Sequence, residues 1–544
     1  MVKEDLVPRK KDQFRLRNFI VCFLLSLGCW GFGYPSSVIA PVLAEPAFLT
    51  YFNLVDVTTS KTTNYGQSII GALNGVYQAG AFINVFITCN FSDRFGRKWA
   101  MHWNAFLGII GGTILTASVH IAMAMVGRFI LGASAWGFLT LTPIYTSELS
   151  PAAWRGFFVG LNGFNIAFAY AIAAYMGLAF SYAGKGPRAE FSTSNATWRG
   201  PLGIYLFVPI LMIIVTIFSP ESPRWLLMQG RTEEAKEILY KLHTDKDGNT
   251  EFVEEEFAEM VSQIETQRHL KVSWFDMFTK KAYRKRTYIA LFYSFLGQST
   301  GVLVLNNYGP SFYSALGYGL QRQLVFQAGW VTVGYPFCFL GAVLMDRAGR
   351  RPLMMGSIAG CCVCVAVLAA ATARVGDNGS IAALGVAAIY IFIAIYSIGV
   401  DVGGNVFYAE VFQNHVRAKG VALANAVLAL SDLVYLELTP TAQAQVGWKW
   451  FLLFICISAF GTVILYFVLP ETKGVSLERM ARIFGDEEGT GEDTEGPQSV
   501  IRQQEEGSRG GGVSISSTEK ETPLQHHKRD GQTVIETSDH NGSQ

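Results

Sequence analysis

Long apolar stretches, separated by shorter polar segments, fill most of this chain. A helix needs about 20 mainly apolar residues to cross a bilayer core of about 30 Å. Stretches of this kind lie at about 19–43, 68–91, 99–119, 122–146, 156–182, 201–219, 286–314, 324–345, 353–374, 381–409, 418–440 and 449–469. Because irregular backbone cannot face lipid, this pattern predicts an all-α membrane protein with twelve transmembrane helices.

The polar segments contain motifs that occur twice. Asp93–Lys98 follows the second apolar stretch, and Asp346–Pro352 repeats its Asp-Arg-x-Gly-Arg pattern after the eighth. A glutamate also precedes an arginine by seven positions in each half of the chain, first as Glu148 with Arg155 and again as Glu410 with Arg417. These repeats indicate two homologous six-helix bundles, an organisation typical of solute carriers.

The stretches and repeats predict five parts. They are a cytoplasmic segment at 1–18, an N-terminal bundle at 19–219, a central cytoplasmic loop at 220–285, a C-terminal bundle at 286–484 and a tail at 485–544. The loop has two amphipathic helix patterns, Thr232–Lys241 and Glu251–Gln267, which we expect to pack under the bundles. The tail is rich in Gly, Ser, Glu, Gln and Thr, a composition that predicts disorder.

Basic residues set the predicted orientation. With the N-terminus in the cytoplasm, most Lys and Arg residues of the short loops lie inside, as the positive-inside rule requires. The sequons at Asn195 and Asn378 then fall in outside loops, where glycosylation is feasible. We therefore expect a multi-pass protein with both termini in the cytoplasm.

Composition agrees with a membrane location and excludes several classes of protein. Half of the residues are hydrophobic, 16% are charged, and the mean hydropathy is +0.28. The net charge of +1 gives no reason to expect a nucleic-acid partner. The eight cysteines lie in apolar stretches, and Cys361, Cys362 and Cys364 have no nearby His, so we expect neither disulfides nor a metal site. No nucleophile–base set or phosphate loop is evident, which argues against an enzyme and against a cofactor.

Six sequence blocks resemble those of the sugar porter family in the major facilitator superfamily, over about residues 19–484. They are Asp93–Lys98, Gly127–Gly132, Pro143–Gly156, Pro220–Leu226, Asp346–Pro352 and Pro470–Gly474. The resemblance implies the fold of that superfamily and carriage of a sugar-like solute by alternating access. The tail composition is most similar to fungal members, which implies a plasma-membrane location, and we expect a monomer in the lipid bilayer.

Opposite charges gather at the predicted cytoplasmic helix ends. We expect them to pair between helices, to hold the inner face shut and to separate when the halves move apart. The resemblance implies this gating role for six residues: Arg97, Glu148, Arg155, Arg350, Glu410 and Arg417. The alternative is that these charges only anchor helix ends at lipid headgroups.

The predicted cavity departs from the family pattern. Proton-coupled members carry an aspartate where this chain has Pro35, so coupling by that route is doubtful and facilitated diffusion is favoured. Several amides that contact sugar in the family are replaced, for example by Gly163 and Gly334. The substrate-binding candidates are Phe32, Arg128, Asn162, Tyr170, Gln298, Asn307, Tyr308, Asn405 and Asp432.

Each candidate also has a structural interpretation. The tyrosines can serve packing, Gln298 an interhelical hydrogen bond, and Arg128 an anchor. A carboxylate inside a membrane helix costs about 2.5–3.5 kcal/mol, so Asp401 and Asp432 are candidates for a proton site, a partner of Arg128 or a cation site. Asp401 can instead cap a helix near the headgroups.

Three functions remain open from sequence. The leading hypothesis is a facilitative carrier of a sugar or sugar-like solute. The second is a proton-coupled importer or exporter of an organic acid or specialised metabolite, coupled through Asp401 or Asp432. The third is a non-transporting nutrient sensor that signals through its tail.

Overall fold

The computed structural model describes residues 15–56, 62–151, 154–183, 194–244, 251–268, 272–374, 379–412 and 416–471. Within these ranges the chain is almost entirely helical, apart from an isolated β-bridge between Val55 and Thr62. The predicted all-α class is therefore confirmed. The sequon at Asn378 and the tail 485–544 lie outside the described residues.

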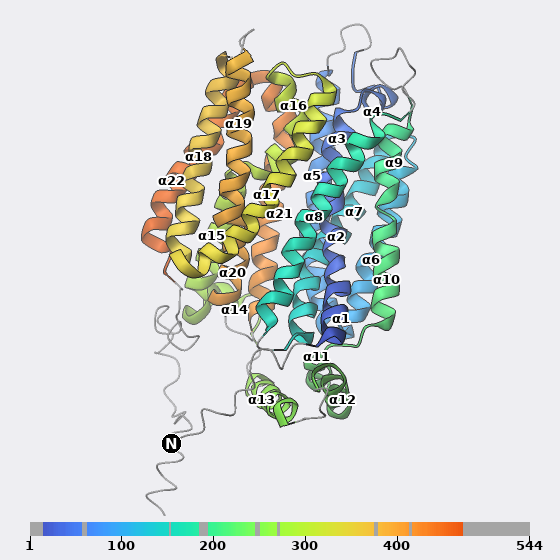
Figure 1. Cartoon of the computed structure of the whole chain (residues 1–544), viewed down its shortest axis with the longest axis vertical. Helices are drawn as coiled ribbons and strands as arrows, with labels where there is room; N and C mark the ends of the chain where they lie inside the picture. Colours follow the sequence, from blue (N-terminus) through green and yellow to red (C-terminus); the bar gives the residue numbers. More distant parts are fainter. Residues whose placement is uncertain are drawn as a thin grey trace, which may run out of the picture. The chain divides into compact units, whose positions relative to one another are not determined.

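The N-terminal half, defined here as α1–α10, covers the first six predicted stretches (Figure 1). The first stretch is divided into α1 (Leu16–Ser26), a 3₁₀ turn (Leu27–Cys29), α2 (Trp30–Ser37) and α3 (Ile39–Ala44). The helices that follow are α4 (Pro46–Tyr51), α5 (Asn64–Phe95), α6 (Arg97–Thr116), α7 (Ile121–Leu149), α8 (Arg155–Phe180), α9 (Ala196–Ile204) and α10 (Phe207–Phe218).

The C-terminal half, defined as α15–α22, covers the other six stretches. Its helices are α15 (Lys281–Ser299), α16 (Val302–Ala315), α17 (Leu320–Ala348), α18 (Arg350–Arg374), α19 (Gly379–Tyr396), α20 (Val402–Val411), α21 (Arg417–Val446) and α22 (Phe451–Val468). The seventh stretch is broken between α15 and α16, where Gly301 has φ +87°, a conformation that favours glycine. Ser397–Asp401, between α19 and α20, form a π-helix. Such segments often occur at functional sites.

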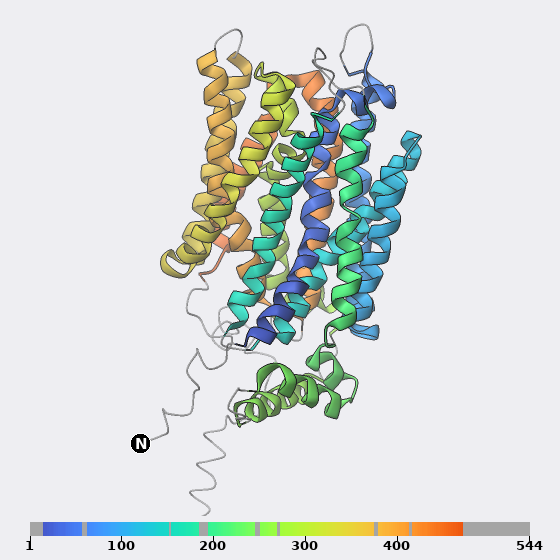
Figure 2. The same cartoon turned by 45° about the vertical axis from the view of Figure 1, so that its right-hand side comes forward.

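Ten helical segments of the described chain are long and apolar enough to cross a membrane. They cover every predicted stretch except the third, which forms α6. The last two stretches, which form α21 and α22, are counted as one segment. Separate crossings by α6 and α22 therefore stay a prediction. Figures 1 and 2 show the long helices running along one common direction, with the two halves in contact through α5 with α21 and α8 with α17.

The central loop forms α11 (Pro223–Met228), α12 (Thr232–His243), α13 (Glu251–Arg268) and α14 (Asp276–Thr279). Its predicted amphipathic helices correspond to α12 and α13. His243 joins the loop to the bundle, because its ring nitrogens lie 3.1 Å from the Leu149 carbonyl and 2.7 Å from Glu256. This contact places α12 against the C-terminal end of α7.

Candidate functional site

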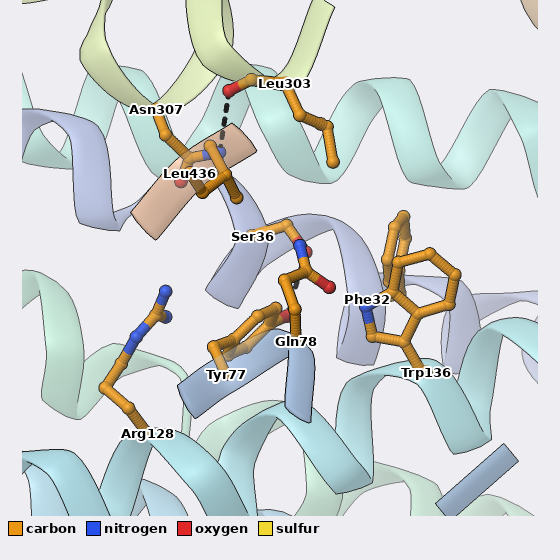
Figure 3. A pocket seen from close by; sticks show the side chains of 9 residues that line it. All are labelled: Phe32, Ser36, Tyr77, Gln78, Arg128, Trp136, Leu303, Asn307 and Leu436. Atoms are coloured by element: carbon orange, nitrogen blue, oxygen red, sulfur yellow. Dashed lines mark hydrogen bonds between the residues drawn. The ribbon is translucent and has the colours of Figure 1, made fainter. Parts of the chain in front are cut away.

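A small pocket lies where the two halves meet, and its walls come from both of them (Figure 3). The N-terminal half supplies residues of α2, α5 and α7, and the C-terminal half supplies residues of α16 and α21. The lining residues are Phe32, Ser36, Tyr77, Gln78, Arg128, Trp136, Leu303, Asn307 and Leu436. Its cavity volume of about 10 Å³ has room for about one water molecule, so the walls must move apart to admit a larger solute.

Three of the predicted binding residues line this pocket. The ring of Phe32 packs edge-on against Trp136 at 5.4 Å between centroids. Asn307 donates its amide to the Leu303 carbonyl within α16, which leaves its carbonyl oxygen as an acceptor. Arg128 is the third.

Arg128 is fully buried and is held by neutral groups. Its guanidinium donates to the carbonyls of Pro35 and Leu73 and to Oδ1 of Asn74, at 3.0–3.3 Å. It also lies 4.1 Å from the centre of the Tyr77 ring, in cation–π geometry. No carboxylate of the described residues forms an ion pair with Arg128 in this conformation, so pairing with Asp401 or Asp432 stays a prediction.

A chain of hydrogen bonds leads from Arg128 across to the other half. Asn74 of α5 accepts from Arg128 and donates to the Tyr308 hydroxyl of α16 at 2.9 Å. Tyr308 in turn donates to the Leu436 carbonyl of α21 at 2.7 Å. Tyr308, a predicted substrate contact, is therefore engaged in holding the halves together in this conformation.

Four buried polar atoms, two in the pocket lining and two in predicted binding residues outside it, have no hydrogen-bond partner among the described residues. They are Gln78 Oε1, Trp136 Nε1, Gln298 Oε1 and Asp432 Oδ2. An unpaired buried polar group costs about 1–3 kcal/mol, so this concentration is typical of a site that binds water or a polar ligand. Gln298 and Asp432 were predicted from sequence, whereas Gln78 and Trp136 were not.

Two other predicted contacts lie away from the pocket lining. Asn162 donates to the Val159 carbonyl of its own helix at 3.0 Å and lies 3.6 Å from the Cys29 sulfur. Tyr170 packs against Phe32 at 6.2 Å between ring centres. Asn405 belongs to α20, but its side chain lies outside the described residues.

The starts of α6 and α18 carry two charge pairs, one in each half. Arg97, which begins α6, donates from Nε and Nη2 to the two carboxylate oxygens of Glu148, both at 2.7 Å. Arg350, which begins α18, directs Nε and Nη2 to Oε1 of Glu410, at 3.2 and 2.9 Å. The structure shows these charges paired between helices, and both pairs lie within one half. Their predicted role in holding the inner face shut stays a prediction.

Arg155 and Arg417 begin α8 and α21, and the side chain of Arg155 lies outside the described residues. Two glutamates of the family-like blocks, which were not among the six predicted gating residues, complete this network. Glu221 accepts from the backbone amides of Arg97 and Lys98, and Glu471 accepts from those of Arg350 and Arg351. These carboxylates cap the starts of α6 and α18, where the helix dipole favours negative charge. Burial raises the pKa of Glu221, and hydrogen bonds from backbone amides oppose that rise.

Asn195, a predicted glycosylation site, is exposed just before α9, and Trp198 Nε1 donates to its side-chain oxygen at 3.2 Å.

The sequence of this chain is similar to that of known proteins of one family. Residues 21–484 match the family model described as Sugar (and other) transporter. The chain is 30% identical over 461 residues to the MFS-type transporter criB of Aspergillus cristatus, covering 84% of this chain and 90% of that protein. It is 26% identical over 488 residues to the high-affinity glucose transporter of Kluyveromyces lactis, covering 86% and 85%.

Among solved structures, the chain superposes on a partially occluded, inward-open form of the xylose transporter XylE from E. coli. The TM-score is 0.70 with 20% sequence identity, over 84% of this chain and 99% of that one. This likeness shows a shared fold.

Proposed function

Because the chain belongs to the family of sugar and other transporters of the major facilitator superfamily, and is therefore a membrane carrier rather than an enzyme, we propose that it moves a sugar or sugar-like solute by facilitated diffusion. Alternating movement of the two halves would expose the pocket to each side in turn. The observation that carries this proposal is the pocket itself: it is lined from both halves and contains polar atoms that lack partners.

Those unpaired atoms suit a hydroxylated solute. A hydroxyl group both donates and accepts, so a polyol can satisfy the Gln78 oxygen and the Trp136 N–H together. The ring of Trp136 and that of Phe32 offer an apolar surface beside these groups. A relative that is named a glucose transporter supports the same class of solute.

The surroundings of Arg128 support facilitated diffusion. A proton-coupled carrier needs a group that gains and loses a proton, and Pro35 offers only its backbone carbonyl to Arg128. The remaining partners of the guanidinium are an amide oxygen, a carbonyl and an aromatic ring, none of which titrates as an acid near neutral pH. This arrangement would keep the interactions of Arg128 independent of pH.

Uptake of radiolabelled hexoses into proteoliposomes tests the proposal. We expect saturable glucose flux that a pH gradient does not change. Trp136→Phe keeps the ring but removes the unpaired N–H, so KM should rise about 5- to 10-fold for a lost hydrogen bond of about 1 kcal/mol or more. Trp99→Phe is the matched control, since Trp99 is 65% exposed on α6 and should leave uptake unchanged. Flux that follows the pH gradient would instead favour proton coupling, and absence of hexose flux would contradict the proposal.

The finer assignments belong to the same proposal. We place the protein in the plasma membrane as a monomer with both termini in the cytoplasm, and we assign 19–219 and 286–484 to the moving bundles. The charge pairs would then keep each bundle rigid during the movement, because each joins helices of one half. Glycosylation at Asn195 and Asn378 would mark the outer side.

A further inference from the structure

Asp432 is a buried carboxylate for which the carrier proposal has no role so far. It lies in the middle of α21 and is 1% exposed. Its Oδ2 atom has no hydrogen-bond partner among the described residues. Leu436, four residues later, lines the pocket. Positions four apart share a face of a helix, so Asp432 lies one turn from the pocket on the pocket-facing side of α21.

Two further acceptors and one donor in the membrane-spanning helices are buried without a partner among the described residues. The side-chain oxygens of Gln298 and Gln78 also lack partners, and Trp136 supplies the unpaired donor. Asp401 lies in the π-helix of the same half, where it accepts from the Cys338 thiol at 3.4 Å. Asp401 and Asp432 both interact electrostatically with Tyr170 and Tyr396, which places the two carboxylates about a common region.

The nearest source of positive charge in the pocket is already engaged. The guanidinium of Arg128 donates hydrogen bonds to Asn74 and to the carbonyls of Leu73 and Pro35. Oδ2 of Asp432 therefore has no donor, cationic or neutral, among the described residues. A buried carboxylate without a partner is unfavourable, and a cation that enters the site would relieve this cost.

We propose that the solute carries a protonated amino group, which binds Asp432, on a hydroxylated body that donates to Gln298 and Gln78. This inference rests on the proposed carrier function and narrows its substrate class to amine-bearing sugars or polyols. An ammonium group offers three N–H donors and a positive charge, which matches a site rich in acceptors. A carboxylate on the solute would face Asp432 as a like charge, so organic acids are poor substrates.

Three hexoses of similar size test this inference in proteoliposomes of the full chain: glucosamine, glucose and glucuronate. Measurements at about pH 6 keep the amine protonated, since amino groups of this kind have pKa values near 8. We expect kcat/KM for glucosamine to exceed that for glucose on the order of tenfold, as one charge-assisted hydrogen bond would give, and glucuronate to be slowest.

Asp432→Asn removes the charge and keeps the shape. The preference for glucosamine over glucose should then disappear, chiefly through a rise in KM for glucosamine. Glu233→Gln is the matched control, because Glu233 is an exposed carboxylate on α12 of the central loop, away from the pocket. It should keep the wild-type preference.

If Asp432→Asn does not fold, the wild-type protein still decides: glucosamine should raise its Tm more than glucose at equal concentration. Glucose flux equal to or above that of glucosamine would overturn the amine proposal while the carrier function stands. Flux of both sugars that a pH gradient drives, and that Asp432→Asn uncouples, would show that Asp432 binds a proton and would also overturn it. Absence of all three fluxes would remove the carrier proposal as well.

Discussion

The two halves share one plan at the starts of α6 and α18 but differ in their charge pairs there. In both, a glycine with positive φ makes the turn between two long helices: Gly96 has φ +99° and Gly349 has φ +96°. In both, a glutamate that follows the last helix of the half accepts from the first backbone amides of the helix after the glycine turn, α6 or α18. The pairs diverge, since the side chains of Arg97 and Glu148 are 6% and 9% exposed, against 13% and 27% for Arg350 and Glu410.

The two halves thus share the turn and the amide cap, whereas the burial of their ion pairs differs. The turn and the amide cap are equal in both halves, because they depend on backbone geometry that only glycine and a suitably placed carboxylate provide. The ion pair depends on side chains that adjust to their surroundings. The N-terminal pair is drier and engages both oxygens of Glu148, so it should contribute more to stability than its counterpart.

The largest effect should come from Glu148→Ala. It leaves the buried guanidinium of Arg97 without its main partner, and breaking a buried pair costs about 3–5 kcal/mol. Thermal unfolding of the purified protein in detergent should show a marked fall in Tm. Glu234→Ala serves as the control, because its pair with Arg231 is about half exposed and should matter little.

Replacing either turn glycine, Gly96 or Gly349, by alanine should lower the free energy of unfolding by nearly the same amount. Alanine at Gly96 or Gly349 would adopt an unfavourable φ and bring its Cβ within 2.6 or 2.9 Å of the capping carboxylate. A loss of about 2 kcal/mol is expected at each, from strain of about 1–3 kcal/mol. Tm values of the two variants that differ widely would contradict a shared backbone plan.

Glu410→Ala should cost less than Glu148→Ala. Its pair is more exposed and both donors converge on Oε1, so a loss of about 1–2 kcal/mol is expected. The Tm of this variant, measured beside that of Glu148→Ala, checks the order. The reverse order would show that exposure does not set the strength of these pairs.

The smallest effect concerns the pH dependence of the cap at Glu221. Burial raises its pKa, so the folded chain binds the proton more tightly than the unfolded chain. The stability that this group contributes is then largest below its unfolded pKa and is lost as pH rises through the folded value. Relative to the Tm of the wild type, the Tm of Glu221→Gln should rise slightly between about pH 4 and about pH 7. A shift in the opposite direction would mean that the amide hydrogen bonds outweigh burial.

The helices were readily predicted because membrane-spanning segments need long apolar runs, and each predicted stretch coincides with one or more helices. Breaks within stretches were harder. Gly301 divides the seventh stretch, and the first is divided near Leu27–Cys29, although neither site interrupts the apolar pattern. Hydropathy reports burial in lipid, and it does not report the local backbone conformation.

The site was predicted only in part, for a related reason. Asp432 was recognised because charge is costly in a membrane, and Arg128 because it belongs to a block that resembles the family. Gln78, Asn74 and Trp136 are ordinary residues of their helices, and only packing shows that Gln78 and Trp136 lack partners while Asn74 joins the halves. Which helices a charge pair joins was likewise settled by tertiary structure, since Arg97 and Glu148 are 51 positions apart.

The π-helix at Ser397–Asp401 gives this chain a place where a change in length is absorbed locally. A π-turn accommodates one residue more than an α-turn, so deleting a single residue there would restore an uninterrupted α-helix. Because the wide turn already takes up the extra residue, Val402–Val411 would keep nearly the same orientation about the helix axis relative to Gly379–Tyr396. Glu410 would stay close to Arg350, whereas the same deletion within a regular α-turn would rotate it by about 100°.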